Sequence, residues 1–433
     1  MINSKIAKFL TFLIPIKKYR KLARKKIENF LYIPLVKKIK KKQIRLHQEI
    51  QKKSSLNVIF FVMYDSIFPA KSLFEAMNKD AYFNPCIVII PDTTRGEKNM
   101  HMQMEKTFNT FHSEYSKVFF SYDKSTKKFI DYSRQADLIC FSNPYDNATN
   151  QFYQISYCSN FTLTFHIPYS YTGFLNYNKK IFSSIEYVLL WKIFVENEDT
   201  LKLIKENQIY QVNNLILSGY SKMDTLIQNK KNNHLSSSKT AIIIAPHHTI
   251  KKDSPLNLSN FLRLSDFYLE LPKLYPNIHF IFRPHPLLFL NLKNSHIWNQ
   301  ETIDNYISQL TQYANLTYEN GGDYFDSFLN SSALIHDCGS FIAEYLYLDQ
   351  PECFIIQNQK QIDTEFTPAG KNLLQYLYIA QNKNDIINFI DEIVLKNQDY
   401  LKQKRIQFAK QFIKINYPNA TQYLINFLKK ELK

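Results

Sequence analysis

Short runs of apolar residues alternate with longer amphipathic segments along most of the chain. The runs have the length of buried strands, and segments such as residues 258–274 between them have a helical period. In the first half of the chain the runs are residues 58–63, 86–90, 136–141, 163–165 and 215–217; in the second half they are residues 241–245, 278–282, 333–335 and 352–356. Strands that alternate with helices predict parallel sheets with right-handed crossovers.

The pattern occurs twice, so the sequence predicts an α/β protein with two Rossmann-like, doubly wound domains that face each other across a cleft. We expect them at residues 54–230 and 239–371, with a boundary in the Asn-, Lys- and Ser-rich stretch 226–238. Residues 372–433 are expected to form C-terminal helices, and residues 1–53 a basic amphipathic helical arm. A length of 433 residues fits two cores better than one. Sheets of this kind bind ligands at the carboxyl ends of their strands.

Charge changes this picture only at the N-terminus. Residues 1–53 hold 17 of the 54 lysines and arginines but two acidic residues, so nearly all of the net charge of +16 lies there. Apolar faces interleaved with Lys and Arg are typical of a helix lying on an anionic membrane, where each basic residue contributes about 1 kcal/mol. We therefore expect residues 1–45 to bind such a surface, at the cytoplasmic face of the membrane. A basic helix packed on its own domain is the alternative.

Other targeting and binding classes fit less well. The apolar run 9–16 is too short to span a bilayer and is followed by no small-residue cleavage site, so a secretory signal is not expected. No nucleic-acid-reading module follows the arm, which disfavours nucleic acid as a partner. The five cysteines have no paired spacing, which predicts neither a disulfide framework nor a zinc site and favours a reducing compartment.

A strand that turns sharply into a helix is predicted at residues 331–346. The apolar run ends at Asp337, Ser340 stands at the N-cap position, and Glu344 follows one helical turn later. The backbone N–H groups of such a helix start attract phosphate. Alternatively, Ser340 is only a cap and Asp337 only ends the strand.

Histidines and an arginine follow the other strand ends of the second domain. His247 and His248 come after one predicted strand, and Arg283 and His285 after the next. No acidic cluster of the kind that binds metals accompanies them. Together with Ser340 they therefore predict a pyrophosphate clamp that works through charge-assisted hydrogen bonds, without a metal or other cofactor. A mixed capping and zinc role for His247 and His248 is the alternative.

The first domain offers a candidate base and candidate acceptor contacts. His166 ends a predicted strand, and a neutral imidazole suits proton abstraction from a hydroxyl group near pH 7. A purely structural histidine is the alternative. Candidate acceptor-binding residues beyond neighbouring strands are Asn143, Tyr145, Asp146, Tyr169 and Ser170. The pattern is equally compatible with a β-turn at residues 143–146 and with packing of Tyr169 in the core.

These motifs resemble the CDP-glycerol glycerophosphotransferase family, which includes the polymerases of teichoic-acid and capsule type. The similarity covers roughly residues 57–360. It is carried by Pro246-His247-His248-Thr249, by Phe282-Arg283-Pro284-His285-Pro286 and by Asp337-x-x-Ser340-x-x-x-Glu344-Tyr345-Leu346. Weaker matches are Gly219-Tyr220-Ser221-Lys222-Met223-Asp224, where the family has proline in place of the serine, and His166-Ile167-Pro168, where many members carry His-Gly-Thr-Pro.

The resemblance implies a fold of the glycosyltransferase-B type and a peripheral membrane enzyme. It implies transfer of glycerol phosphate, or a related polyol phosphate, from a CDP-activated donor to a hydroxyl of a cell-surface polymer or its lipid-linked precursor, with CMP leaving in line. The two catalytic residues that it implies are His166, as the base, and His285. Donor contacts are implied for His247, His248, Arg283, His285, Ser340 and Glu344, with Asp337 orienting the loop.

Two other functions remain open on the sequence. A glycosyltransferase that uses a nucleotide sugar would share the pyrophosphate clamp. A non-catalytic membrane-docking scaffold would need none of these side chains.

Overall fold

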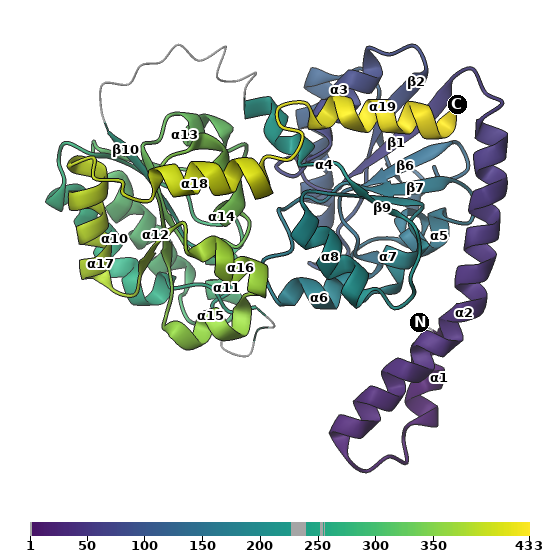
Figure 1. Ribbon diagram of the computed structural model, residues 1–433, viewed down its shortest axis with the longest axis horizontal. Helices are drawn as coiled ribbons and strands as arrows, with labels where there is room; N and C mark the ends of the chain where they lie inside the picture. Colours follow the sequence, from purple (N-terminus) through teal and green to yellow (C-terminus); the bar gives the residue numbers. More distant parts are fainter. Residues whose placement is uncertain (1, 227–239, 252–253, 255) are drawn as a thin grey trace.

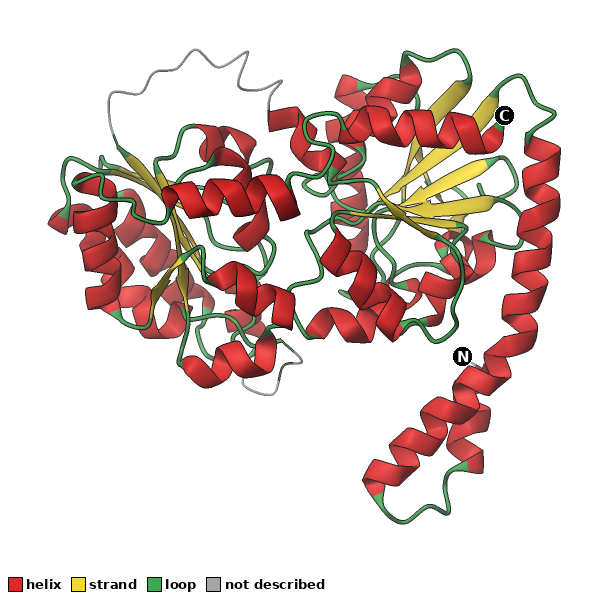
Figure 2. Cartoon of the chain, in the orientation of Figure 1, coloured by secondary structure: helices red, strands yellow, loops and turns green. Residues whose placement is uncertain are grey.

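The computed structural model describes residues 2–226, 240–251, 254 and 256–433, apart from the side chains of residues 2–5. It contains two α/β domains and a long N-terminal helix that projects from the first of them (Figure 1; Figure 2). The fold predicted from the sequence is therefore confirmed. Apart from Leu226, the boundary predicted at residues 226–238 lies outside the described residues.

The N-terminal domain is built on a seven-stranded parallel sheet in the order β3-β2-β1-β6-β7-β8-β9. Its strands are β1 (Leu56–Val62), β2 (Phe83–Ile89), β3 (Val118–Phe120), β6 (Leu138–Phe141), β7 (Leu163–His166), β8 (Lys192–Val195) and β9 (Leu215–Leu217), with a small hairpin of β4 (Tyr122–Asp123) and β5 (Lys128–Phe129) beside them. Its helices are α3 (Lys71–Asn78), α4 (Glu97–Glu114), α5 (Ile155–Cys158), α6 (Tyr177–Phe182), α7 (Ile185–Leu189) and α8 (Glu198–Asn207).

Both faces of this sheet are buried, which explains why β1 is apolar at nearly every position. Val58, Phe60 and Val62 pack into the core on one face, and Ile59 and Phe61 into the core on the other. A parallel sheet covered by helices on both sides requires such continuous apolar strands. The predicted strands of this domain are confirmed, whereas β3 and β8 were not predicted.

The C-terminal domain has a six-stranded parallel sheet in the order β12-β11-β10-β13-β14-β15. Its strands are β10 (Ala241–Ala245), β11 (His279–Phe282), β12 (Leu316–Tyr318), β13 (Ala333–His336), β14 (Glu352–Ile355) and β15 (Tyr378–Ala380). Its helices are α10 (Phe261–Leu274), α11 (Leu288–Asn294), α12 (Gln300–Thr311), α13 (Phe325–Leu329), α14 (Phe341–Glu344), α15 (Gln359–Glu365), α16 (Pro368–Leu374), α17 (Lys383–Asn388) and α18 (Lys402–Phe408). Strands β11, β10 and β13 are neighbours, so the residues that follow them meet at one edge.

The C-terminal segment does more than add helices to the second domain. Within residues 372–433, predicted to be helical throughout, β15 extends the second sheet by pairing with β14. The last helix, α19 (Ala420–Leu432), returns to the first domain and lies along α3 (Figure 1). Its residues Leu424 and Leu428 are buried in the same core as Phe74. The chain therefore crosses between the domains twice, which ties them together.

The first part of the basic N-terminal segment projects from the protein, and its second part packs on the first domain. Helices α1 (Ile2–Leu10) and α2 (Lys17–Ile50) form it, and the first part of α2 projects away from the sheet (Figure 1). Further along α2, Val36 and Ile39 are buried in the first domain, and the Gln43 side-chain amide donates to the carbonyl of Leu189 at 2.6 Å. The second half of α2 thus packs on its own domain. No helix within the described ranges has both the length and the apolar character needed to cross a bilayer.

Candidate functional site

A cavity of about 670 Å³ lies between the carboxyl ends of the two sheets and receives residues from both domains. His166 lines it from the first domain; His247, His248 and His285 line it from the second. An apolar cluster that contains Tyr171 and Phe174 of the first domain and Ile342 and Leu346 of the second joins the two halves. Most of the side chains predicted to be functional are therefore brought together.

Three histidines of the second domain form one cluster. His247 and His248 follow β10, and His285 follows the neighbouring strand β11. The ring centroids are 4.4 Å apart for His247 and His248 and 4.1 Å apart for His248 and His285. Burial lowers the pKa of His248 to about 4 and the pKa values of His247 and His285 well below the usual 6.5. All three rings are therefore uncharged near neutral pH.

The position of the proton on two of these rings follows from their hydrogen bonds. Nδ1 of His285 accepts the backbone N–H of Leu287 at 3.1 Å. Nδ1 of His248 accepts the side-chain amide of Asn291 at 3.1 Å, and the same amide donates to the His248 carbonyl at 3.0 Å, which fixes its orientation. A nitrogen that accepts a hydrogen bond carries no proton, so in both neutral rings the proton is on Nε2.

His247 has the same tautomer for a related reason. The Thr249 hydroxyl accepts the backbone N–H of Leu258 at 3.0 Å, so its own proton is available to Nδ1 of His247, 2.8 Å away. The backbone N–H of Thr249 also points to this Nδ1, at 3.4 Å. The cluster therefore presents three Nε2–H donors.

This arrangement suits an anion better than a metal ion. One nitrogen from each ring lies within 4.8 Å of the others, a spacing that could hold a metal. A histidine that ligates a metal, however, directs its other ring nitrogen as an N–H donor to an acceptor. Here Nδ1 of His248 and Nδ1 of His285 each face a donor, so binding a metal through Nε2 of these rings would require breaking both hydrogen bonds. Phosphate oxygens accept from Nε2–H groups without such a change.

Asp337 supports the cluster from behind. It is fully buried and does not line the cavity. Its carboxylate accepts the backbone N–H of His247 at 2.6 Å and the backbone N–H of Asn260 at 2.5 Å. Burial raises the pKa of Asp337 to about 6, against the opposing effect of these hydrogen bonds. Asp337 thus fixes the turn after β10 rather than facing a ligand.

Arg283 is also held by the protein. Its two terminal amino groups donate to Glu319 and to the carbonyl of Gly322, both at 2.5 Å. The side chain is nearly buried at the wall of the cavity. Its positive charge lies at the cavity wall, but each of its two terminal amino groups already donates to an acceptor within the protein. Neither Glu319 nor Gly322 belongs to a motif, so no sequence pattern indicated them.

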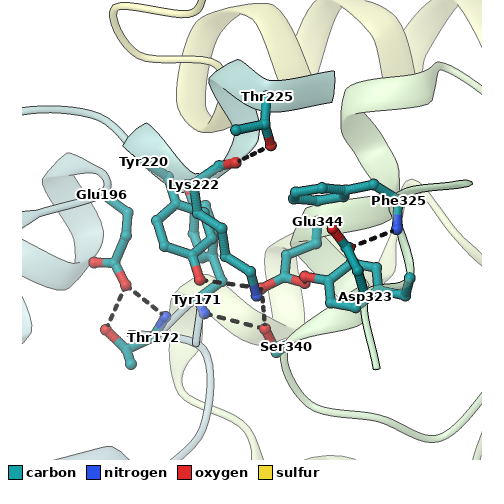
Figure 3. A network of polar contacts seen from close by, with 11 residues as sticks. Tyr171, Thr172, Glu196, Tyr220, Lys222, Thr225, Asp323, Phe325, Ser340 and Glu344 are labelled. Atoms are coloured by element: carbon teal, nitrogen blue, oxygen red, sulfur yellow. Dashed lines mark hydrogen bonds and ion pairs between the residues drawn. The ribbon is translucent and has the colours of Figure 1, made fainter. Parts of the chain in front are cut away.

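Glu344 is the centre of a network that joins the domains (Figure 3). It accepts the Ser340 hydroxyl at 2.6 Å and the Tyr220 hydroxyl at 3.2 Å, and it also binds the hydroxyl of Tyr324. The ammonium group of Lys222 lies 3.6 Å from the same carboxylate. Tyr220 and Lys222 belong to the first domain, so Glu344, predicted as a donor contact, links the two domains in this structure.

Ser340, also predicted as a donor contact, likewise links the two domains. It precedes α14, a helix of one turn, but its hydroxyl does not cap that helix. The oxygen instead accepts the backbone N–H of Tyr171 at 3.1 Å, from the first domain. The strand-to-helix turn predicted from the sequence is present, and its serine points at the domain interface.

His166 differs from the cluster in the position of its proton. Nδ1 lies 2.8 Å from the carbonyl oxygen of Phe141, an acceptor, so this nitrogen carries the proton. In the neutral ring Nε2 is therefore an unprotonated acceptor. Burial lowers the pKa of His166 to about 4, so the ring is neutral at pH 7. A base with a free lone pair thus stands at the same cavity as three N–H donors.

The predicted acceptor residues divide into two groups. Asn143, Tyr145, Tyr169 and Ser170 line the cavity. Asp146 does not: its carboxylate accepts the backbone N–H groups of residues 155 and 156, at 2.6 and 3.0 Å, at the start of α5. Its carboxylate therefore holds the start of α5 and does not face the cavity.

The sequence interpretation missed one part of the wall, the segment after β2. Asp92 and Arg95 line the cavity from there, beside Tyr64, which follows β1. They lie beyond the carboxyl end of a strand, the same criterion that identified His166. They were missed because they belong to no recognisable motif.

Comparison with known proteins agrees with this geometry. The model of the family described as CDP-Glycerol:Poly(glycerophosphate) glycerophosphotransferase matches residues 178–430. No match is found among curated proteins.

Solved structures share the fold at low sequence identity. The wall teichoic acid polymerase TagF, in a variant soaked with CDPG, is 15% identical with a TM-score of 0.58, over 94% of this chain and 97% of that one. The UDP-GlcNAc 2-epimerase from Neisseria meningitidis bound to UDP-GlcNAc is 13% identical with a TM-score of 0.53, over 87% and 100% of the two chains. The MnaA–UDP complex from S. aureus is 12% identical with a TM-score of 0.55, over 88% and 97%.

Proposed function

The chain belongs to the CDP-glycerol:poly(glycerophosphate) glycerophosphotransferase family, and on that premise we propose how its cavity carries out the transfer. The enzyme moves glycerol phosphate from CDP-glycerol to a hydroxyl group. In our proposal the hydroxyl oxygen forms a bond to the phosphorus that carries the glycerol. The bond from that phosphorus to the oxygen shared with CMP breaks, and CMP leaves in line.

One observation carries the proposal: the histidines on the two sides of the cavity hold their protons on opposite ring nitrogens. His166 offers an unprotonated Nε2, which takes the proton of the attacking hydroxyl. His285 and His248 offer Nε2–H groups, which donate to the diphosphate and to the CMP oxygen as negative charge develops there. Each side thus has the hydrogen-bonding character that its half of the reaction needs.

The acceptor in this proposal is a polymer of glycerol phosphate, or its lipid-linked precursor, of the teichoic-acid type. The family description names poly(glycerophosphate), and the similar structure TagF is a wall teichoic acid polymerase. Tyr169 and Ser170 stand beside His166 at the cavity wall, where a terminal glycerol unit would enter.

We further propose that the projecting arm holds the enzyme on the cytoplasmic face of the membrane. Large apolar side chains of the arm are exposed to solvent, among them Phe9 at 82% and Leu13 at 89%. Lysines and arginines lie on both sides of this apolar run in the sequence. Such a surface suits an anionic leaflet, into which the apolar groups insert while the cations stay among the headgroups.

A donor screen tests the reaction. The purified protein is incubated with CDP-glycerol, CDP-ribitol and several nucleotide sugars in the presence of a glycerol phosphate oligomer, and the nucleotide released is identified. CMP released from CDP-glycerol in an acceptor-dependent manner is the expected result. Release of a nucleoside diphosphate from a nucleotide sugar would identify a glycosyltransferase instead, and no release from any donor would favour the scaffold.

Two histidines of the same strand region provide a matched pair for this assay. His285 follows the carboxyl end of β11 and lines the cavity, whereas His279 begins the same strand and contacts Thr317 at 3.0 Å. The His285→Ala variant should lose CMP release, and the His279→Ala variant should retain it. Equal activity of the two variants would contradict the proposed donor site.

A further inference from the structure

Arg95 reaches the histidine cluster from the opposite domain. It lies in the segment between β2 and α4 of the first domain and lines the same cavity as His248 and His285. Its positive charge adds to the effect of burial in lowering the pKa of both histidines. Arg95 and the histidine cluster therefore line one cavity from opposite domains.

The side chain of Arg95 is held so that its fork stays free. Its Nε lies 3.1 Å from a carboxylate oxygen of Asp92, and its guanidinium stands 5.5 Å from the ring centre of Tyr64. Asp92 is itself fixed by two hydrogen bonds. Its Oδ2, the oxygen that faces Arg95, accepts the Tyr64 hydroxyl, and its Oδ1 accepts the backbone N–H of Thr94 at 2.8 Å. The two terminal amino groups of Arg95 have no acceptor in the described part of the chain, and the side chain is 34% exposed.

The other cations of the cavity wall are engaged differently. Arg283 directs both terminal amino groups to Glu319 and Gly322. Lys222 faces Glu344 at 3.6 Å. Among the lysines and arginines of the cavity wall, as far as the structure describes it, Arg95 is thus the one with a guanidinium fork open to a ligand.

Charge balance indicates what this fork is for. A diphosphate diester such as CDP-glycerol carries two negative charges, and the histidine cluster supplies hydrogen bonds but no charge. A phosphate taken out of water without a cation is costly. An arginine fork is the group that binds a phosphate through two parallel hydrogen bonds.

We propose that Arg95 binds the phosphate that is transferred, from the acceptor side of the cavity. This inference rests on the proposed function. Arg95 and His166 come from the same domain, and the histidine cluster comes from the facing one. The phosphate between Arg95 and the cluster is therefore the one exposed to the attacking hydroxyl. As the bond to CMP breaks, the two amino groups of Arg95 stay on the non-bridging oxygens of this phosphate while the cluster keeps the CMP oxygen.

The chain contains a matched control for this arginine. Arg134 also pairs with an aspartate three residues earlier, with its Nε 3.9 Å from Asp131, and it also lies over an aromatic ring, 4.0 Å from the centre of Phe161. It belongs to the same domain but does not line the cavity. Arg95→Gln and Arg134→Gln therefore remove the same kind of side chain, and they differ in access to the phosphate.

The experiment measures CMP release from CDP-glycerol and the affinities for CDP-glycerol and for CMP. Because hydrogen bonds to a charged group are lost, Arg95→Gln should lower kcat/KM on the order of 10- to 100-fold. Arg95→Lys, which keeps the charge without the fork, should lie between it and the wild type. Affinity for CMP, which lacks the transferred phosphate, should change less than about twofold, and Arg134→Gln should match the wild type.

The outcomes separate this inference from the function on which it rests. A wild-type protein that releases no CMP from CDP-glycerol refutes the proposed function itself. An active wild type with Arg95→Gln as active as Arg134→Gln refutes the role of Arg95. An equal loss of CMP and CDP-glycerol affinity in Arg95→Gln overturns the assignment to the transferred phosphate, because Arg95 would then hold the CMP phosphate. Thermal unfolding of each variant shows whether it is folded.

Discussion

Replacement of His166 by asparagine removes the proposed base while keeping its anchor. The Nδ2 amide of asparagine lies near the position of the histidine Nδ1, so it can still donate to the Phe141 carbonyl, 2.8 Å away in the wild type. No atom then takes the place of the unprotonated Nε2. A positioned general base contributes about 10²–10⁴-fold to the rate, or about 3–5 kcal/mol of transition-state stabilisation. We therefore expect kcat to fall by that factor while the affinity for CDP-glycerol stays within about twofold.

The pH dependence of this variant adds a second measurement. A base acts in its deprotonated form, so its contribution is present above its pKa and is lost as the pH falls through it. With a pKa of about 4 for His166, the ratio of wild-type to His166→Asn activity should be constant from pH 8 to pH 5.5. Taking this ratio cancels the titration of other groups.

Two results would refute the reasoning. A roughly tenfold fall of that ratio between pH 7.5 and 5.5 would mean an ordinary histidine pKa near 6.5, and burial would not control the ring. An equal loss of CDP-glycerol affinity and of kcat would make His166 a binding residue. Steady-state release of CMP and calorimetric titration with CDP-glycerol provide the two quantities. His166→Ala, which leaves the Phe141 carbonyl without this donor, shows how much of any loss is structural.

The remaining two predictions concern the support of the site and the arm. Asp337→Asn turns one acceptor oxygen into an amide that faces a backbone N–H, so the free energy of unfolding, measured with urea, should fall by about 3 kcal/mol. The control is Asp363→Asn, which changes an exposed partner of Lys371 and should lower the free energy of unfolding by less than about 0.5 kcal/mol. Equal stability of the two variants would show that the turn after β10 does not depend on the Asp337 carboxylate. Deletion of residues 2–28, which spares the packed half of α2 from Asn29 onward, should abolish sedimentation with anionic vesicles and leave activity on a soluble acceptor unchanged. Vesicle binding by the wild type that does not weaken with added salt would contradict an electrostatic arm.

The sequence by itself determined the two sheets and the strand ends that carry the chemistry. Strands buried on both faces must be apolar at successive positions, so β1 and β10 are visible without any structure. Polar residues at the carboxyl ends of such strands stand out from the apolar runs, which made His166, His247 and His285 identifiable. Strands β3 and β15 lie at sheet edges, and each has an exposed middle residue, so they lack the burial on both faces that makes a central strand recognisable.

What the tertiary structure alone decided is the state of each group at the cavity. Whether a histidine is a base or a donor depends on its Nδ1 partner, which is the Phe141 carbonyl for His166 and the Leu287 N–H for His285. These partners come from the backbone, whose position is set by the fold and not by any motif. The same holds for Arg95, whose fork is free only because Asp92 and Tyr64 hold the rest of the side chain. A sequence specifies which groups reach the strand ends, but protonation and orientation depend on neighbours that only folding brings into contact.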